Sequence, residues 1–176
     1  MDQLKKCIEE AIKVNKTLTS LPSPIGVADK QFDKVPTLEP GVYRKASPML
    51  MSRFQMLGYW KNATHGDWLS LTEMESLWAN NDSSYIENIK EQIVAVSENW
   101  ANDACALFKK NRISIYAAEG NGYERIYIVW FDEVEEPELW VYDTNGVARY
   151  KNLLCYLKAY LNDDLSAYNN SWIIGL

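Results

Sequence analysis

Residues that commonly build metal sites, redox sites and membrane spans are scarce in this chain of 176 residues. Its three cysteines include no Cys-x-x-Cys pair, so spacing excludes zinc ribbons and thioredoxin-type redox sites. The longest uninterrupted apolar run, Ile126 to Phe131, is far shorter than the roughly 20 residues of a membrane-spanning helix. No apolar stretch typical of a signal peptide follows the first residues. We therefore expect a cytoplasmic protein of a reducing compartment that does not bind membranes.

Positively charged residues are also fewer than negatively charged ones. The 18 Lys and Arg residues are outnumbered by 24 Asp and Glu residues, which gives a net charge of −6. Because binding to a phosphate backbone depends on Lys and Arg, direct binding to nucleic acid is not expected. Aromatic residues, by contrast, are plentiful at 12%, and the hydrophobic share of 47% is ordinary for a globular protein. Length and composition together predict a single domain over residues 1–176.

The N-terminal half reads as mainly helical. Apolar residues spaced three and four apart predict a helix over residues 2–18. The proline-rich stretch 20–48 predicts a connector with at most one short helix around residues 29–35. Residues 48–60 are ambiguous in type, and 61–67 read as a polar loop. The capping boxes Ser70-Leu-Thr-Glu73 and Ser84-Tyr-Ile-Glu87 predict two more helices, of which the second is the longest in the chain.

The C-terminal half changes to strand patterns. Residues 113–118, 125–131 and 138–143 are rich in β-branched and aromatic residues and are separated by turn sequences. A closing helix is predicted over Tyr150 to Leu161, after a turn at Asn145-Gly146. The order of helices, then strands, then one helix predicts an α+β fold, in which helices pack on one face of a largely antiparallel sheet.

Motifs that would support catalysis or a cofactor are absent. The single histidine, His65, lies in a loop without a second His or Cys nearby, so we interpret it as a surface or loop-anchoring residue. Gly120-Asn-Gly122 lacks both the third glycine and the following helix of a dinucleotide-binding loop, which leaves a hairpin turn. We accordingly predict no catalytic residue, no metal and no cofactor.

Two features could bind a protein partner. One is an acidic turn of five carboxylates within seven positions, namely Asp132, Glu133, Glu135, Glu136 and Glu138. Such a cluster is either a solvated turn, in which the carboxylates repel one another, or a docking patch for a basic partner. The other feature is the pair Trp60 and Trp68, which flank the loop 61–67. Exposed tryptophans are typical of binding hot spots, although core packing is the alternative explanation.

The stretch Leu69-Ser-Leu-Thr-Glu-Met-Glu-Ser-Leu-Trp78 resembles a helix of the SUKH superfamily. The segments that follow resemble that family in their order: a strand at 113–116, a Gly/Asn turn at 118–122, strands at 126–130 and 140–142, and a helix at 153–161. The resemblance covers residues 26–161 and leaves the helix 2–18 outside it.

The resemblance implies an α+β domain without enzymatic activity. Most bacterial members of that superfamily look like immunity proteins that bind and neutralise a toxin domain, commonly a nuclease. A basic nuclease would be the electrostatic complement of an acidic inhibitor. We therefore expect a cytoplasmic bacterial immunity protein whose partner is a cognate protein toxin. An interaction or regulatory adaptor of the same fold is the alternative. A small metal-dependent hydrolase that uses the acidic cluster is a third hypothesis.

Overall fold

The computed structural model describes residues 2–29, 32–79, 109–119, 122, 124–143, 146–164 and 168–169. The predicted long helix from Ser84 lies outside these residues, as do Trp100, Cys105 and Trp172. In the described part of the chain, no helix combines the length and the apolar character that a membrane span requires.

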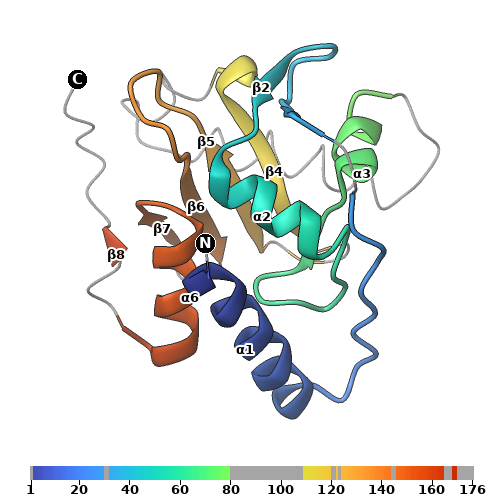
Figure 1. The fold of residues 1–176 in the computed structure, drawn as a ribbon, viewed down its shortest axis with the longest axis vertical. Helices are drawn as coiled ribbons and strands as arrows, with labels where there is room; N and C mark the ends of the chain where they lie inside the picture. The colour runs from blue at the N-terminus through green and yellow to red at the C-terminus, as the bar shows by residue number, and fades with distance from the viewer. Residues whose placement is uncertain are drawn as a thin grey trace.

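The centre of the molecule is an antiparallel sheet in which the strands β3 to β8 follow one another in sequence order (Figure 1). Its strands are β3 (Asp67–Trp68), β4 (Ile113–Ala118), β5 (Arg125–Val129), β6 (Glu138–Asp143), β7 (Gly146–Tyr150) and β8 (Tyr168–Asn169). Each described pair of neighbours runs antiparallel. The predicted α+β class and the three predicted strands of the C-terminal half are therefore confirmed.

Helices α1 (Asp2–Leu18), α2 (Pro48–Met56) and α6 (Leu153–Asn162) lie in front of this sheet in the view of Figure 1. A fourth helix, α3 (Leu71–Ser76), lies beside α2 in the same view, and a short 3-10 helix, η1 (Lys110–Arg112), precedes β4. The predicted helix 2–18 is confirmed with its buried stripe of Leu4, Ile8, Ala11 and Asn15. Both hydrogen bonds of the predicted Ser70 capping box are formed, since the side chains of Ser70 and Glu73 each accept the backbone N–H of the other residue.

The strands β4 and β5 form the middle of the core. Every residue of both strands is buried, including the charged Arg125. β5 pairs with β4 on one edge and with β6 on the other, which confirms it as a central strand. A strand that is covered on both faces needs a continuous apolar run rather than alternation, and this explains the sequence Ile-Tyr-Ile-Val at 126–129.

The predicted start of the closing helix at Tyr150 is wrong. Residues 146–150 form β7, which pairs with β6 so that Tyr150 lies opposite Leu139. The helix begins at Leu153, where the Asn152 side chain caps it by accepting the backbone N–H of Cys155 at 3.0 Å. β7 directly follows its partner in the chain, but its sequence Gly-Val-Ala-Arg-Tyr carries only a weak strand pattern of its own.

The stretch 20–48 was predicted as a connector with at most one short helix, and its described residues form no helix around 29–35. Instead, β1 (Lys34–Pro36) pairs with β2 (Tyr43–Lys45) as a separate two-stranded sheet. Gly41, at φ +78°, occupies the turn between them, a conformation that favours glycine. The ambiguous stretch from residue 48 resolves as α2, because Ser47 caps its start and Pro48 occupies the first helical turn.

Candidate functional site

The predicted acidic turn lies between β5 and β6, and its first carboxylate is held from two sides. Asp132 accepts a hydrogen bond from Arg44 on β2, with Nη1 and Oδ1 3.3 Å apart, and another from Arg112 at the end of η1. Arg44 also donates from Nε to the carbonyl of Asn111 at 2.9 Å. Because the Asp132 side chain is about half exposed, such ion pairs contribute only about 0–1 kcal/mol of stability each. Their main effect is to fix the turn against β2.

Two further carboxylates of the turn are occupied by the fold. Glu136 Oε1 accepts the backbone N–H of Met49 at 2.9 Å, in the first turn of α2, where N–H groups lack helical partners. Glu138 accepts two hydrogen bonds from Arg149 at 3.0 and 2.9 Å, and one from the Trp140 indole at 2.7 Å. These carboxylates join the turn to α2 and to β7.

The remaining two acids, Glu133 and Glu135, are exposed and have no partner among the described residues. Val134, between them, is 49% exposed, one of few large hydrophobic side chains on the described surface. The repulsion expected among five clustered carboxylates is thus offset in part, because three of them face N–H donors. Within the turn, Glu133 and Glu135 are therefore the carboxylates without a contact in the described fold, and Val134 lies exposed between them.

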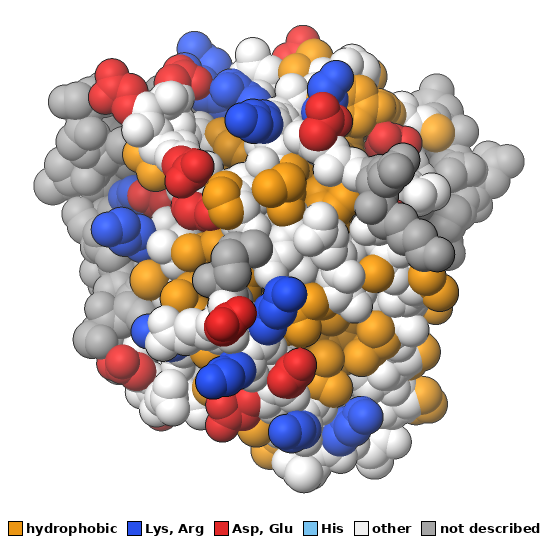
Figure 2. Space-filling view, viewed as in Figure 1, with side chains coloured by type: hydrophobic (Ala, Val, Ile, Leu, Met, Phe, Trp, Pro, Cys, Tyr) orange, Lys and Arg blue, Asp and Glu red, His pale blue; other side chains and the backbone are white. Residues whose placement is uncertain are grey.

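A groove of about 360 Å³ separates this turn from the loop that joins β2 to α2. Hydrophobic and charged groups share its lining, which consists of Arg44, Lys45, Ala46, Ser47, Pro48, Met51, Trp130, Phe131, Asp132, Val134 and Glu135. Trp130 is only 6% exposed, and its indole N–H has no hydrogen-bond acceptor in the described part of the chain. Over β2 and α2, Figure 2 shows side chains of both charges beside hydrophobic ones. The groove can thus contact a partner through apolar, acidic and basic groups.

Trp60 and Trp68 do not belong to this surface, so the prediction that they bind a partner is wrong for this structure. Both side chains are fully buried, and their rings pack edge to face with centroids 5.0 Å apart. The Trp60 indole donates to Ser23 at 2.6 Å, and the Trp68 indole donates to Thr64 at 2.9 Å. Their backbones also pair with each other, which explains the burial of residues that flank a polar loop.

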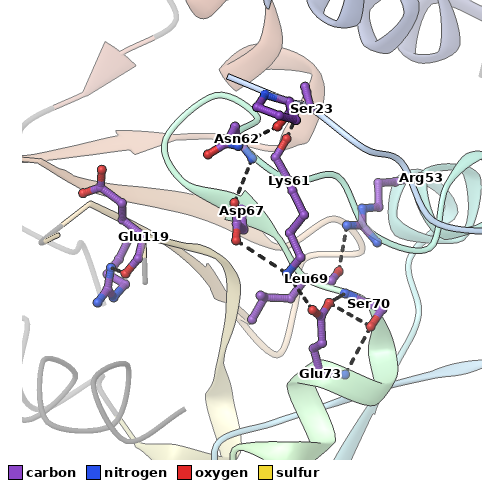
Figure 3. A network of polar contacts seen from close by, with 11 residues as sticks. Ser23, Arg53, Lys61, Asn62, Asp67, Leu69, Ser70, Glu73 and Glu119 are labelled. Carbon is purple, nitrogen blue, oxygen red and sulfur yellow. Dashed lines mark hydrogen bonds and ion pairs between the residues drawn. The ribbon is translucent and has the colours of Figure 1, made fainter. Parts of the chain in front are cut away.

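A buried arginine lies against these aromatic rings. Arg53, on α2, is fully buried and donates to the carbonyls of Gly58 at 3.0 Å and Leu69 at 2.7 Å (Figure 3). Its guanidinium carbon lies 4.0 Å from the centroid of the Phe54 ring and 5.1 Å from that of Tyr116. Burial lowers the pKa of Arg53, although an arginine stays protonated at neutral pH. Arg53 therefore ties α2 to the start of α3.

An ion-pair network continues from this point across the loop 61–67 (Figure 3). Lys61 Nζ lies 2.6 Å from Glu73 Oε1 and 3.5 Å from Asp67 Oδ2. Burial alone would raise the pKa of the Glu73 carboxyl. The Lys61 ammonium and the Ser70 donors outweigh that effect, so this pKa lies below its usual value. The network holds the loop to α3.

His65 anchors the same loop to α6, in agreement with its predicted role. Its Nδ1 lies 2.7 Å from the hydroxyl of Tyr156, which in turn donates to Thr64 Oγ1 at 2.5 Å. Burial raises the pKa of Tyr156 well above its usual value, so this hydroxyl stays protonated. Within the described residues, no cluster of three or more His, Cys, Asp and Glu side chains could hold a metal ion.

No protein-family model, no curated protein and no solved structure matches this chain.

Proposed function

We propose that this protein is a non-enzymatic immunity protein that binds and neutralises a cognate toxin domain in the bacterial cytoplasm, with a basic nuclease as the leading candidate. The observation that carries the proposal is the exposed triplet Glu133, Val134 and Glu135 at the edge of the groove. Its carboxylates serve no contact within the described fold, and they flank an exposed apolar side chain. This combination of apolar contact and polar rim is typical of protein-binding surfaces.

A SUKH-like fold is part of the same proposal. Its support is the order of elements: a capped helix at α3, the strands β4, β5 and β6, and the helix α6 occur in the order that the resemblance implies, with β7 as an additional strand between β6 and α6. The acidic balance of the chain gives further support. A nuclease domain carries positive charge to hold its substrate, and opposite potentials accelerate encounter between two proteins.

The first experiment identifies the partner. The full chain, tagged and expressed in its native host, is captured and its bound proteins are identified by mass spectrometry. Recovery of a basic toxin domain, followed by loss of its toxicity when this chain is added, would support the proposal. Recovery of only endogenous regulatory proteins would favour the adaptor alternative. Inhibition of the toxin without any direct binding would contradict the proposed mechanism.

The second experiment tests the surface. The double charge reversal Glu133→Lys with Glu135→Lys should slow association with the toxin about tenfold at low salt, and added salt should slow the wild type in the same direction. Glu136 stays unchanged because it caps α2. The matched control, Glu9→Lys with Glu10→Lys, makes the same change in net charge on the exposed face of α1. Equal association rates for the two double variants would show that the acidic turn is not the docking site.

A further inference from the structure

The chain between α1 and β1 exposes hydrophobic side chains along the outer side of the molecule (Figure 1). Most of the large hydrophobic side chains that are exposed on the described surface belong to residues 18–27, namely Leu18, Leu21, Ile25 and Val27, with exposed fractions of 41–87%. Figure 2 shows hydrophobic side chains gathered at the lower right, where Figure 1 places this segment. From Thr19 to Ala28 the sequence contains no charged residue. The protein thus keeps an uncharged apolar strip in contact with solvent, a feature typical of interaction sites.

Within this strip, residues 24–27 extend the central sheet. Ile25 forms an antiparallel β-bridge with Trp60, and Trp60 forms another with Trp68 of β3. The sheet therefore continues beyond β3 through the stretch around Trp60 to residues 24–27. We call residues 24–27 the outer edge.

The planarity of the peptide bond determines which backbone groups of the outer edge face away from the sheet. Across a trans peptide, the carbonyl of one residue and the N–H of the next point in opposite directions. Three hydrogen bonds join the outer edge to its inner neighbour: Lys61 N–H to the Pro24 carbonyl at 3.0 Å, Gly26 N–H to the Tyr59 carbonyl at 2.9 Å, and Gly58 N–H to the Gly26 carbonyl at 3.2 Å. The N–H and C=O of Ile25 and the N–H of Val27 consequently face outward. Among the described residues, these three groups have no hydrogen-bond partner.

The outer edge lacks the features that commonly protect a strand edge. Such protection comes from charged side chains, bulges, or prolines that remove a donor from the free side. Pro24 removes no donor there, because the nitrogen and carbonyl of one strand residue face the same side, and the Pro24 carbonyl faces inward to Lys61. Val27, whose N–H faces outward, is uncharged and 87% exposed. Another extended strand can therefore pair with this edge.

The loop behind the outer edge holds it in place. Gly66 has φ +87°, and a Cβ there would lie 2.5 Å from the carbonyl carbon of Ala118, so the loop 61–67 packs directly on the end of β4. The Ser23 hydroxyl donates to the Lys61 carbonyl at 2.9 Å and accepts the Trp60 indole N–H at 2.6 Å. Because the edge is already ordered, a strand that pairs with it loses less affinity to conformational entropy.

From these observations we propose that the outer edge pairs with the outer edge of a second copy of this chain, as antiparallel strands related by a two-fold axis at Ile25. In this register the two Ile25 residues exchange both of their outward N–H and C=O groups. Each Val27 N–H then lies opposite the Ser23 carbonyl of the other copy, and that carbonyl has no partner among the described residues. The segment is thus complementary to itself, as an interface with two-fold symmetry requires.

Charge favours this segment over other surfaces as the place where two copies meet. Each chain carries a net charge of −6, so two copies repel each other, and repulsion is weakest along the uncharged residues 19–28. The short edge and its few apolar side chains form a contact near the lower limit for specific interfaces, about 1,000 Å² in total. We therefore expect a reversible dimer with a micromolar dissociation constant. This proposal is independent of the proposed immunity function.

The first test is sedimentation velocity of the full chain from about 1 μM to 1 mM, the range in which such a dimer forms and dissociates. Val27→Lys adds a lysine to each outer edge and should raise the dissociation constant at least about tenfold. The matched control Val134→Lys makes the same change at a valine outside the strip, and should leave the equilibrium unchanged.

The second test is hydrogen exchange at single backbone amides, followed by NMR at several protein concentrations. The amides of Ile25 and Val27 should exchange more slowly as the concentration rises, because only the dimer supplies their acceptors. The Gly26 amide, which is bonded to Tyr59 within one chain, should exchange at a rate that does not depend on concentration. Protection of the Gly26 amide in Val27→Lys also shows that the variant keeps its fold.

Three results would overturn the proposal: a monomer at all concentrations, a dimer that Val27→Lys leaves intact, or a dimer in which neither the Ile25 nor the Val27 amide gains protection. Protection of these amides only in a complex with another protein would also overturn it, and would assign the outer edge to a strand of that partner. Toxin binding at the acidic turn affects none of these measurements, since they use this chain alone.

Discussion

Two clusters of charged residues in this protein use the same residue types in opposite ways. Around Arg53, the guanidinium is fully buried among aromatic rings and bonds to backbone carbonyls. Around Asp132, Arg44 and Arg112 lie at the surface, where solvent screens their ion pairs. The difference teaches that burial, rather than the number of charge contacts, decides which cluster stabilises the fold and which is available to a partner.

The largest effect on stability is expected for removal of an aromatic ring from the buried cluster. Trp68→Ala should lower the free energy of unfolding by about 3–5 kcal/mol, because it leaves a cavity against Trp60 and Tyr116. Urea denaturation followed by circular dichroism measures the change. Trp68→Phe keeps most of the ring contact and should cost clearly less. A loss below about 1 kcal/mol for Trp68→Ala would contradict the packing described for this cluster.

The next largest effect on stability is expected at the buried Arg53, and the exposed Arg44 serves as the comparison. Arg53→Met should destabilise the protein by about 2–4 kcal/mol, because the buried carbonyls of Gly58 and Leu69 lose their donor. Arg44→Met, in the exposed cluster, should cost less than about 1 kcal/mol. Both variants are measured by the same urea titration. Equal losses would show that the distinction between the two clusters does not hold.

A smaller effect, with a characteristic pH dependence, is expected at Glu73. Because the folded-state pKa of this carboxyl lies below its unfolded value, its contribution is complete above the unfolded pKa and is lost as pH falls through the folded one. Glu73→Gln should cost about 1 kcal/mol at pH 7, through the weakened cap and the lost contact with Lys61. That difference should shrink in the acid range, below about pH 4. A difference that stays constant down to pH 3 would exclude the ionised carboxylate as its source.

The smallest effect is expected at the acidic turn. Glu133→Lys with Glu135→Lys should change the free energy of unfolding by no more than about 0.5 kcal/mol, because neither side chain has a partner in the described fold. Glu136→Lys is the contrasting variant, and it should destabilise the protein by removing the acceptor of the Met49 N–H at the start of α2. Thermal melts of both variants test whether the turn divides into structural and free carboxylates.

Local signals in the sequence predicted the elements that carry a capping box or a strong apolar pattern of their own. The Ser70 capping box, the helix 2–18 and the strands at 113–118 and 138–143 all depend on contacts a few residues away or on strong apolar runs. The strand β7 was missed because its residues, Gly-Val-Ala-Arg-Tyr, carry a weak pattern, and their pairing with β6 determines their conformation.

Only part of the candidate site could be predicted from the sequence. The acidic turn could be found as a cluster of like charges, but the pairing of Asp132 and Glu136 depends on residues 20 to nearly 90 positions away. Only Glu138 has its partners nearby, at Trp140 and Arg149. The groove wall formed by the β2–α2 loop left no sequence signal, because this loop is likewise distant from the turn in the chain. Trp60 and Trp68 were candidates for a partner-binding surface because they flank a polar loop, with core packing as the alternative. The structure buries both rings, and their backbones pair with each other.

The contact between Gly66 and the end of β4 has an evolutionary consequence. Any side chain at position 66 would collide with backbone atoms, which cannot move aside as a flexible side chain can. Homologues that keep the loop in this place should therefore retain glycine at this position, even where the residues of the outer edge have diverged. A homologue with another residue there should also show an insertion, a deletion or a shortened β4. In such a homologue the loop would pack differently against the sheet.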